Sequence, residues 1–130
     1  MSQKEIHKKI ILPDGPLIFT ASGAITGKEV LQALRELLND PEFKTSMDIL
    51  WNFLAVTTRI VDAQEIKDLV NFIRTNQTKR GRDYRVALVV SRDMDYGLAR
   101  MYEAYSQDLP FQLRIFEELE EAESWLNLLT

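Results

Sequence analysis

Polar residues that could bind an anion lie between positions 55 and 62, in a segment predicted to be a loop. Thr57 and Thr58 supply hydroxyl groups, and Arg59 supplies a guanidinium group. A helix is expected to begin after Asp62, and the free amide groups at a helix N-terminus attract negative charge. Asp62 itself would repel an anion, and Asp is a common capping residue at a helix start. We therefore interpret Asp62 as a helix cap, while all four residues are candidates for binding a ligand or partner.

A second polar segment, at positions 91–96, contains two carboxylates. Its residues Ser91, Arg92 and Tyr96 are further candidates for contacts with a ligand or partner. A divalent cation needs several oxygen ligands that converge from different segments of the chain. Asp48 is expected at the opposite end of its strand, so it cannot join the two carboxylates of this segment. The sequence therefore predicts no metal site.

Groups for covalent or acid–base catalysis are scarce in this chain. It has no cysteine, which excludes disulfides, zinc–thiolate sites, iron–sulfur clusters and thiol nucleophiles. The single histidine, His7, has no recognisable catalytic partner in the sequence and is interpreted as a solvated strand residue. The five glycines are scattered, so they do not form a phosphate-binding loop. We expect a protein that is not an enzyme and that uses no cofactor.

Length and composition are those of one globular domain spanning residues 1–130. Hydrophobic residues make up 45% and charged residues 28% of the chain. The net charge of −4 has the wrong sign for a general nucleic-acid-binding protein. No apolar run approaches the ~20 residues of a membrane span, and the first residues are too polar for a signal peptide. We expect a cytoplasmic protein without a nucleic-acid or membrane partner.

Hydrophobic periodicity predicts five strands and four helices. The first two strands form a hairpin, and from the second strand onward strands and helices alternate. The expected strands are 6–12, 17–22, 47–54, 86–90 and 111–115. The expected helices are 27–38, 62–73, a helix opened by Asp93 or Asp95 that reaches Tyr105, and 118–128. Loops are expected at 22–26, 55–62, 79–83 and 91–96.

The element order ββαβαβαβα predicts an α/β fold with one five-stranded, mostly parallel sheet. Segments 47–54 and 86–90 are apolar almost without interruption, which is typical of central strands covered on both faces. Thr26 with Glu29, and Asp62 with Glu65, have the spacing of capping boxes at the starts of two helices. Only the first strand is expected to be antiparallel.

Four segments carry a resemblance to a known family. They are ITGKEVLQALRELLNDPEF, MDILWNF, RVALVVSRDMDYGLARMYEAY and the closing RIFEELEEAESWL. Together with the element order they resemble STAS domains, and more closely the SpoIIAA-like (STAS/SEC14-like) branch, over about residues 6–128. The resemblance implies a SpoIIAA-like fold in a bacterial binding module rather than an enzyme.

One departure from that family concerns the start of the second helix. Phosphoregulated STAS domains carry an Asp-Ser-Ser-Gly-like stretch there, whose serine is the switch. The corresponding segment 57–64 contains no serine, and Asp62 falls near the switch position. A carboxylate carries one negative charge, against about 1.5 to 2 for a phosphate, so it imitates a phosphoserine only crudely.

Two functions from different classes remain after these exclusions. The first is a non-enzymatic binding or regulatory domain that contacts an unidentified protein partner. The alternative is a carrier or sensor of a small apolar ligand, which requires an apolar cavity at the carboxyl ends of the strands. A homodimer is also expected, because helices that cover mainly one face of the sheet would leave a large apolar patch exposed on a monomer. The competing expectation is that a helix and the first hairpin cover that face within one chain.

Overall fold

The computed structural model describes residues 5–10, 15–91 and 96–127 as a five-stranded sheet with helices on both faces. In chain order the elements are β1 (Glu5–Ile10), β2 (Leu17–Thr26), α1 (Gly27–Leu38), β3 (Ile49–Ile60), α2 (Ala63–Thr75), α3 (Gln77–Arg80), β4 (Tyr84–Val89), α4 (Tyr96–Tyr105), β5 (Phe111–Phe116) and α5 (Leu119–Trp125). The strands lie side by side in the order β1-β2-β3-β4-β5. β1 pairs antiparallel with β2, and the other neighbouring strands pair in parallel.

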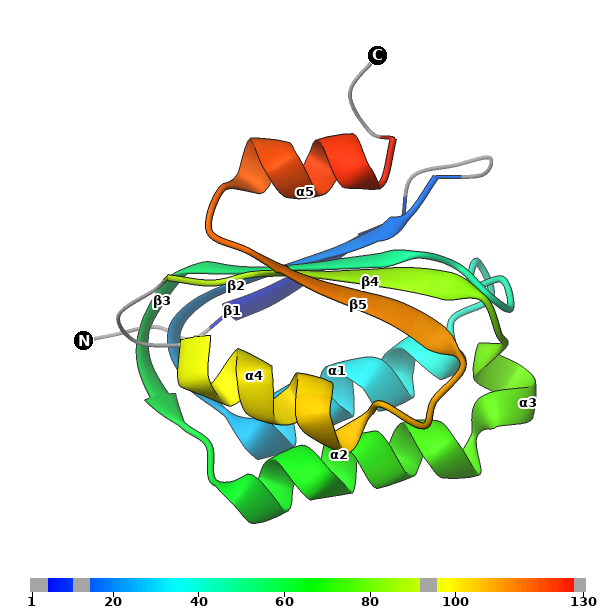
Figure 1. Ribbon diagram of the computed structural model, residues 1–130, viewed down its shortest axis with the longest axis horizontal. Helices are drawn as coiled ribbons and strands as arrows, with labels where there is room; N and C mark the ends of the chain where they lie inside the picture. Colours follow the sequence, from blue (N-terminus) through cyan, green and yellow to red (C-terminus); the bar gives the residue numbers. More distant parts are fainter. Residues whose placement is uncertain (1–4, 11–14, 92–95, 128–130) are drawn as a thin grey trace.

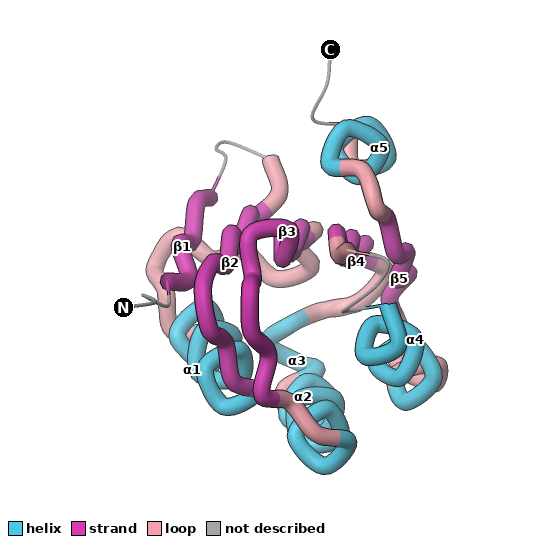
Figure 2. Tube along the Cα trace, turned by 90° about the vertical axis from the view of Figure 1, so that its left-hand side faces the viewer, coloured by secondary structure: helices cyan, strands magenta, loops and turns pink. Residues whose placement is uncertain are grey.

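The helices are divided unequally between the two faces of the sheet. α1, α2 and α4 lie on one face, whereas α5 lies on the other (Figures 1 and 2). Trp51 and Leu88 belong to the core under the three helices, and Leu50, Ala87 and Val89 belong to the core under α5. Both faces of the central strands are therefore covered within one chain.

This coverage changes the basis of the expected homodimer. Leu50 and Ala87 are fully buried beneath α5, so the face that was expected to stay open is closed there by a helix of the same chain. The competing expectation of coverage by a helix is the arrangement found. A homodimer stays a prediction, but an uncovered sheet face no longer supports it.

The expected capping boxes are confirmed at both helix starts. The Glu29 amide donates to the Thr26 hydroxyl, and Glu29 Oε1 accepts from the Thr26 amide in return. The Glu65 amide donates to Asp62 Oδ1 at 2.8 Å, and the Asp62 amide donates to Glu65 Oε1 at 3.2 Å. These bonds satisfy amide groups that the first helical turn leaves without partners, so they define where α1 and α2 begin.

Several expected boundaries are wrong. The segments 22–26 and 55–62 are strand rather than loop as far as Thr26 and Ile60, because the two segments pair with each other in parallel, from Ser22 with Ala55 to Thr26 with Ile60. The expected loop 79–83 begins instead within α3, a short helix whose last residue, Arg80, is buried. The last helix ends at Trp125 among the described residues. Residues 11–12, Asp93 and Asp95, on which other expected boundaries depended, lie outside the described residues.

The side chain of Arg85 joins α5 to the sheet. Arg85 on β4 donates from Nη2 and Nε to the Asp48 carboxylate, at 2.9 and 3.2 Å, and from Nη1 to the Trp125 carbonyl. Its guanidinium also lies 5.6 Å from the Trp125 ring. Asp48 precedes β3, so one side chain ties two strand starts to the carboxyl end of α5.

We expect Arg85→Met to lower the free energy of unfolding by about 1.5–3 kcal/mol, because it removes hydrogen bonds between charged groups and leaves Asp48 half-buried without them. Arg114→Met is the matched control. Arg114 also lies over the Trp125 ring, at 5.5 Å, but is exposed. Urea unfolding measures both variants, and equal losses of stability would contradict this role of Arg85.

Candidate functional site

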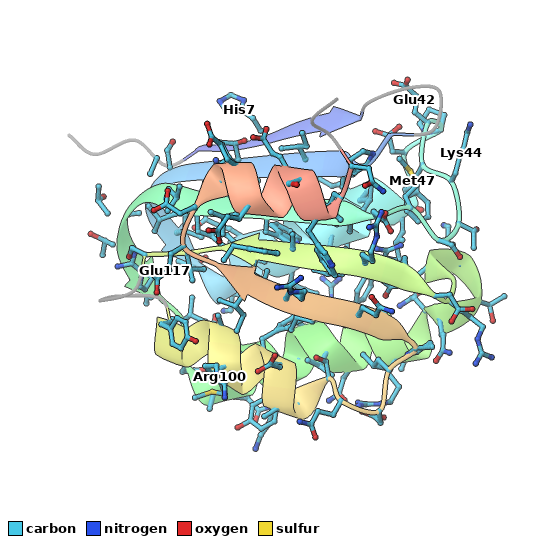
Figure 3. The ribbon with its side chains drawn as sticks, turned by 45° about the horizontal axis from the view of Figure 1, so that its top comes forward. His7, Glu42, Lys44, Met47, Arg100 and Glu117 are labelled. Atoms are coloured by element: carbon cyan, nitrogen blue, oxygen red, sulfur yellow. The ribbon has the colours of Figure 1, made fainter. Side chains whose placement is uncertain are left out.

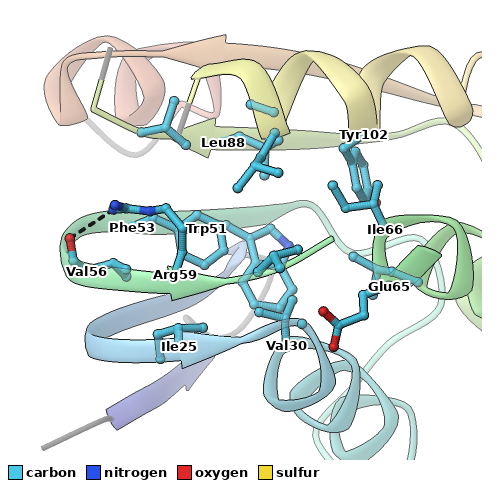
Figure 4. Close-up of a pocket in the computed structure, with 16 residues that line it drawn as sticks. Ile25, Val30, Trp51, Phe53, Val56, Arg59, Glu65, Ile66, Leu88 and Tyr102 are labelled. Atoms are coloured by element: carbon cyan, nitrogen blue, oxygen red, sulfur yellow. Dashed lines mark hydrogen bonds between the residues drawn. The ribbon is translucent and has the colours of Figure 1, made fainter. Parts of the chain in front are cut away.

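An apolar pocket lies at the carboxyl ends of the central strands, between the sheet and the helices α1, α2 and α4 (Figure 4). Its volume is about 110 Å³. The lining residues that are apolar or aromatic come from six elements and the segments that follow them: Ile25, Val30, Trp51, Phe53, Val56, Val61, Ile66, Leu69, Leu88, Val90, Leu98, Ala99 and Tyr102.

The pocket exists because β3 separates from β4. The pairing between β3 and β4 covers only Ile49 to Asn52, whereas the pairing between β2 and β3 continues to Ile60. Beyond Asn52 the long strands β2 and β3 curve around the helical layer (Figure 1). The space opened in this way has β3 on one side and β4 with α4 on the other.

Two irregularities in β3 determine which side chains face the pocket. The β2–β3 register shifts between Thr20 and Ser22, and again between Gly23 and Ala24, and each shift adds one residue to β3. Such bulges reset the alternation of side chains between the faces of a strand. As a result Trp51, Phe53, Val56, Arg59 and Val61 all line the pocket, although a regular strand would send some of them to the opposite face.

Stacked aromatic rings form one wall. The ring of Trp51 lies 4.1 Å from that of Phe19 and 5.7 Å from that of Phe53, in both cases nearly parallel. Trp51 is only 6% exposed. Buried stacked rings have few accessible rotamers, so this wall is preformed.

The polar side chains of the lining are engaged in local hydrogen bonds. Arg59 Nη2 donates to the Val56 carbonyl at 3.0 Å (Figure 4). Glu65 is the capping-box partner of Asp62. A Cβ atom on Gly27 would approach Glu65 Cβ to 2.7 Å, so a glycine is needed where the starts of α1 and α2 meet. The interior of the pocket is left to hydrocarbon and aromatic surface.

Burial raises the pKa of the Tyr102 phenol, which keeps this lining residue neutral at physiological pH. Tyr84, which lies nearby, has a phenol pKa raised by burial as well. Ionisation of either side chain therefore requires strongly alkaline conditions.

The structure brings together only part of the predicted site. Arg59 lines the pocket, whereas Thr57 and Thr58 are exposed on β3 and are absent from the lining. Asp62 is an exposed helix cap beside the pocket.

The second predicted segment is placed less completely. Ser91 follows the buried end of β4 and is half-buried. Tyr96 is 38% exposed at the start of α4. Arg92 lies outside the described residues.

Residues that sequence reasoning missed make up most of the pocket. Trp51 and Leu88 fall in the two segments expected to be central strands, and Tyr102 falls in an expected helix; nothing in their spacing separates core from pocket. The one available signal was the continuation of β-branched residues through positions 56–61, which indicates a strand longer than its neighbour.

The described part of the chain contains no group of three or more His, Asp or Glu side chains that could hold a metal ion. His7 is exposed on β1 (Figure 3). No helix among the described residues is long and apolar enough to cross a membrane.

Comparison with known proteins supports the fold. No model of a known protein family matches this chain, and no curated protein matches it. Among solved structures, the chain is similar to an uncharacterised protein of the DUF3478 family with a SpoIIAA-like fold from Shewanella loihica PV-4. The two share 18% sequence identity with a TM-score of 0.59, over 97% of this chain and 95% of that one. The chain therefore has a STAS/SpoIIAA-like fold, as the resemblance implied.

We expect Asp62→Ala to lower the free energy of unfolding by ~1 kcal/mol, because it removes the cap of α2, and Asp62→Ser to be nearly neutral. Asp68→Ala, at an exposed position within the same helix, is the control and should change stability less. Thermal and urea unfolding measure all three variants. A loss in Asp62→Ala no larger than in the control would show that the cap contributes nothing measurable.

Proposed function

We propose that this protein is a non-enzymatic binding domain that takes a small apolar ligand into the pocket at the carboxyl ends of its strands. The single observation that carries the proposal is the pocket itself, whose lining is almost wholly apolar. Open α/β sheets bind ligands in this position, and small-molecule sites are concave and mostly hydrophobic.

The volume of the pocket limits the ligand. An apolar cavity of roughly 150 Å³ binds a molecule the size of benzene. The pocket of about 110 Å³ therefore suits a group of a few carbon atoms, or part of the apolar chain of a longer molecule. A flat aromatic wall at Trp51 and Phe53 favours close contact with such a group.

The chemistry of the lining argues against catalysis. Its ionisable side chains among the described residues are Arg59, Glu65 and Tyr102. Arg59 and Glu65 are hydrogen-bonded to the backbone, and Tyr102 is held neutral by burial. A general acid or base needs a pKa near the operating pH and access to the reacting atom. Binding without turnover is the function that these side chains support.

Contacts with a protein partner are the second candidate, favoured by three exposed apolar side chains. Leu54 is 43%, Ile60 62% and Tyr96 38% exposed. Each lies within two positions of a pocket residue along the chain. Exposed apolar groups near a binding site are typical of surfaces that a partner covers. A partner that senses the ligand would unite both functions.

We expect Ala99→Leu to weaken binding of 1-hexanol by about tenfold or more, because the added carbons occupy the pocket from α4. Ala33→Leu is the matched control, since Ala33 is a buried alanine of α1 that does not line the pocket. Isothermal titration calorimetry measures both variants after their folding is checked by circular dichroism. Equal affinities in the two variants, or no binding to the unmodified protein, would contradict the proposed pocket.

A further inference from the structure

A smaller cavity adjoins the pocket on the side away from the strand ends. Its volume is about 20 Å³. Trp51, Leu69 and Tyr102 line both cavities, so the two spaces are neighbours. Arg80 lines the small cavity but not the pocket. The small cavity therefore places a charged side chain next to the apolar pocket.

Arg80 is a buried cation whose terminal nitrogens donate no hydrogen bond to the described residues. The side chain is 2% exposed, and neither Nη1 nor Nη2 has a hydrogen-bond partner within the described structure. Its guanidinium lies 3.4 Å from the centre of the Tyr84 ring, on which it stacks. Asp48 acts on it electrostatically, but the Asp48 carboxylate already accepts the hydrogen bonds of Arg85.

The backbone around Arg80 is held firmly in place. The Ser46 amide donates to the Arg80 carbonyl at 2.8 Å, and the Arg82 amide donates to the Ser46 hydroxyl at 3.0 Å. Gly81, between them, has a φ of 100° and lies so close to Ser46 that a Cβ atom would collide with it. A glycine is thus required for the turn that fixes the end of α3 against the core.

A buried guanidinium without hydrogen-bond partners is unfavourable for stability alone. Removing a charge from water is costly, and stacking on an aromatic ring offsets only part of that cost. Burial accordingly lowers the pKa of Arg80, although an arginine remains protonated. Each unsatisfied buried group of this kind calls for a specific reason, and the ability to bind an anion is one.

We infer that Arg80 binds the carboxylate of the ligand and that the ligand is an apolar chain ending in a carboxylate. This inference rests on the proposed function, because the chain itself must occupy the pocket. The two Nη atoms of a guanidinium match the two oxygens of a carboxylate, and such charge-assisted pairs are the strong hydrogen bonds of proteins. The cavity of about 20 Å³ holds about one water-sized atom, so the carboxylate reaches Arg80 only if side chains that the two cavities share move aside.

The experiment compares carboxylates of about four to ten carbon atoms with the alcohols of the same length, using the unmodified protein and calorimetry. We expect each carboxylate that fits to bind about tenfold or more tightly than its matching alcohol. In two-dimensional NMR spectra the side-chain Nε–H signal of Arg80 should shift with the carboxylate and not with the alcohol. Equal affinities of both series would overturn the inference and leave the pocket standing. Failure of both series to bind would overturn the proposed function as well.

Two variants test the assignment to Arg80. Arg80→Met should abolish the preference for the carboxylate while the alcohol still binds. Lys79→Met, which removes the neighbouring exposed charge, should keep the preference. A preference retained in Arg80→Met, or lost equally in Lys79→Met, would show that general surface charge and not Arg80 attracts the carboxylate. The comparison in the unmodified protein decides the matter even if Arg80→Met does not fold.

Discussion

The separation of β3 from β4 after Asn52 is the constraint on which the site depends. Up to that point the sheet is continuous, and its side chains fill the core on both faces. Beyond it β3 keeps its partner β2, so its backbone groups stay hydrogen-bonded on that side while the other side opens. β4 continues its bonding toward β5 instead, where the Val90 amide donates to the Phe116 carbonyl at 2.9 Å. A concave space is thereby formed, and each of the two strands that border it keeps its backbone hydrogen bonds on the side away from the space.

The features that could be predicted from the sequence are those determined by residues close together along the chain. Thr26 and Asp62 were expected to cap helices. Each has a side-chain oxygen just before an apolar repeat, and a Glu follows three positions later, which is the pattern of a capping box. The strand expected at 111–115 is likewise found, at the edge of the sheet, and its apolar residues Phe111, Leu113 and Ile115 alternate with exposed Gln112 and Arg114. Such signals are local, so no knowledge of the folded chain was needed.

The site could not be predicted because its signals are not local. A bulge depends on how two strands pair, and neither β2 nor β3 carries a residue pattern that announces it. Thr57 and Arg59 were expected in the same loop, yet only Arg59 lines the pocket, since one added residue determines which of them faces inward. The burial of Arg80 was equally invisible, because a run of basic residues between two elements ordinarily lies on the surface.

Arg85 and Arg80 illustrate two different uses of a guanidinium in the same small domain. Arg85 has a carboxylate, a carbonyl and an aromatic ring as partners, and it joins α5 to the sheet. Arg80 is more deeply buried, and its guanidinium lies over the rings of Tyr84 and Phe43. Its terminal nitrogens have no hydrogen-bond partner in the part of the chain that is described. A core selected for stability alone would place an apolar side chain at position 80, since paired charges only offset the cost of burial and unpaired ones do not. The contrast between the two residues separates an arginine that holds the fold together from the one that we propose binds a ligand.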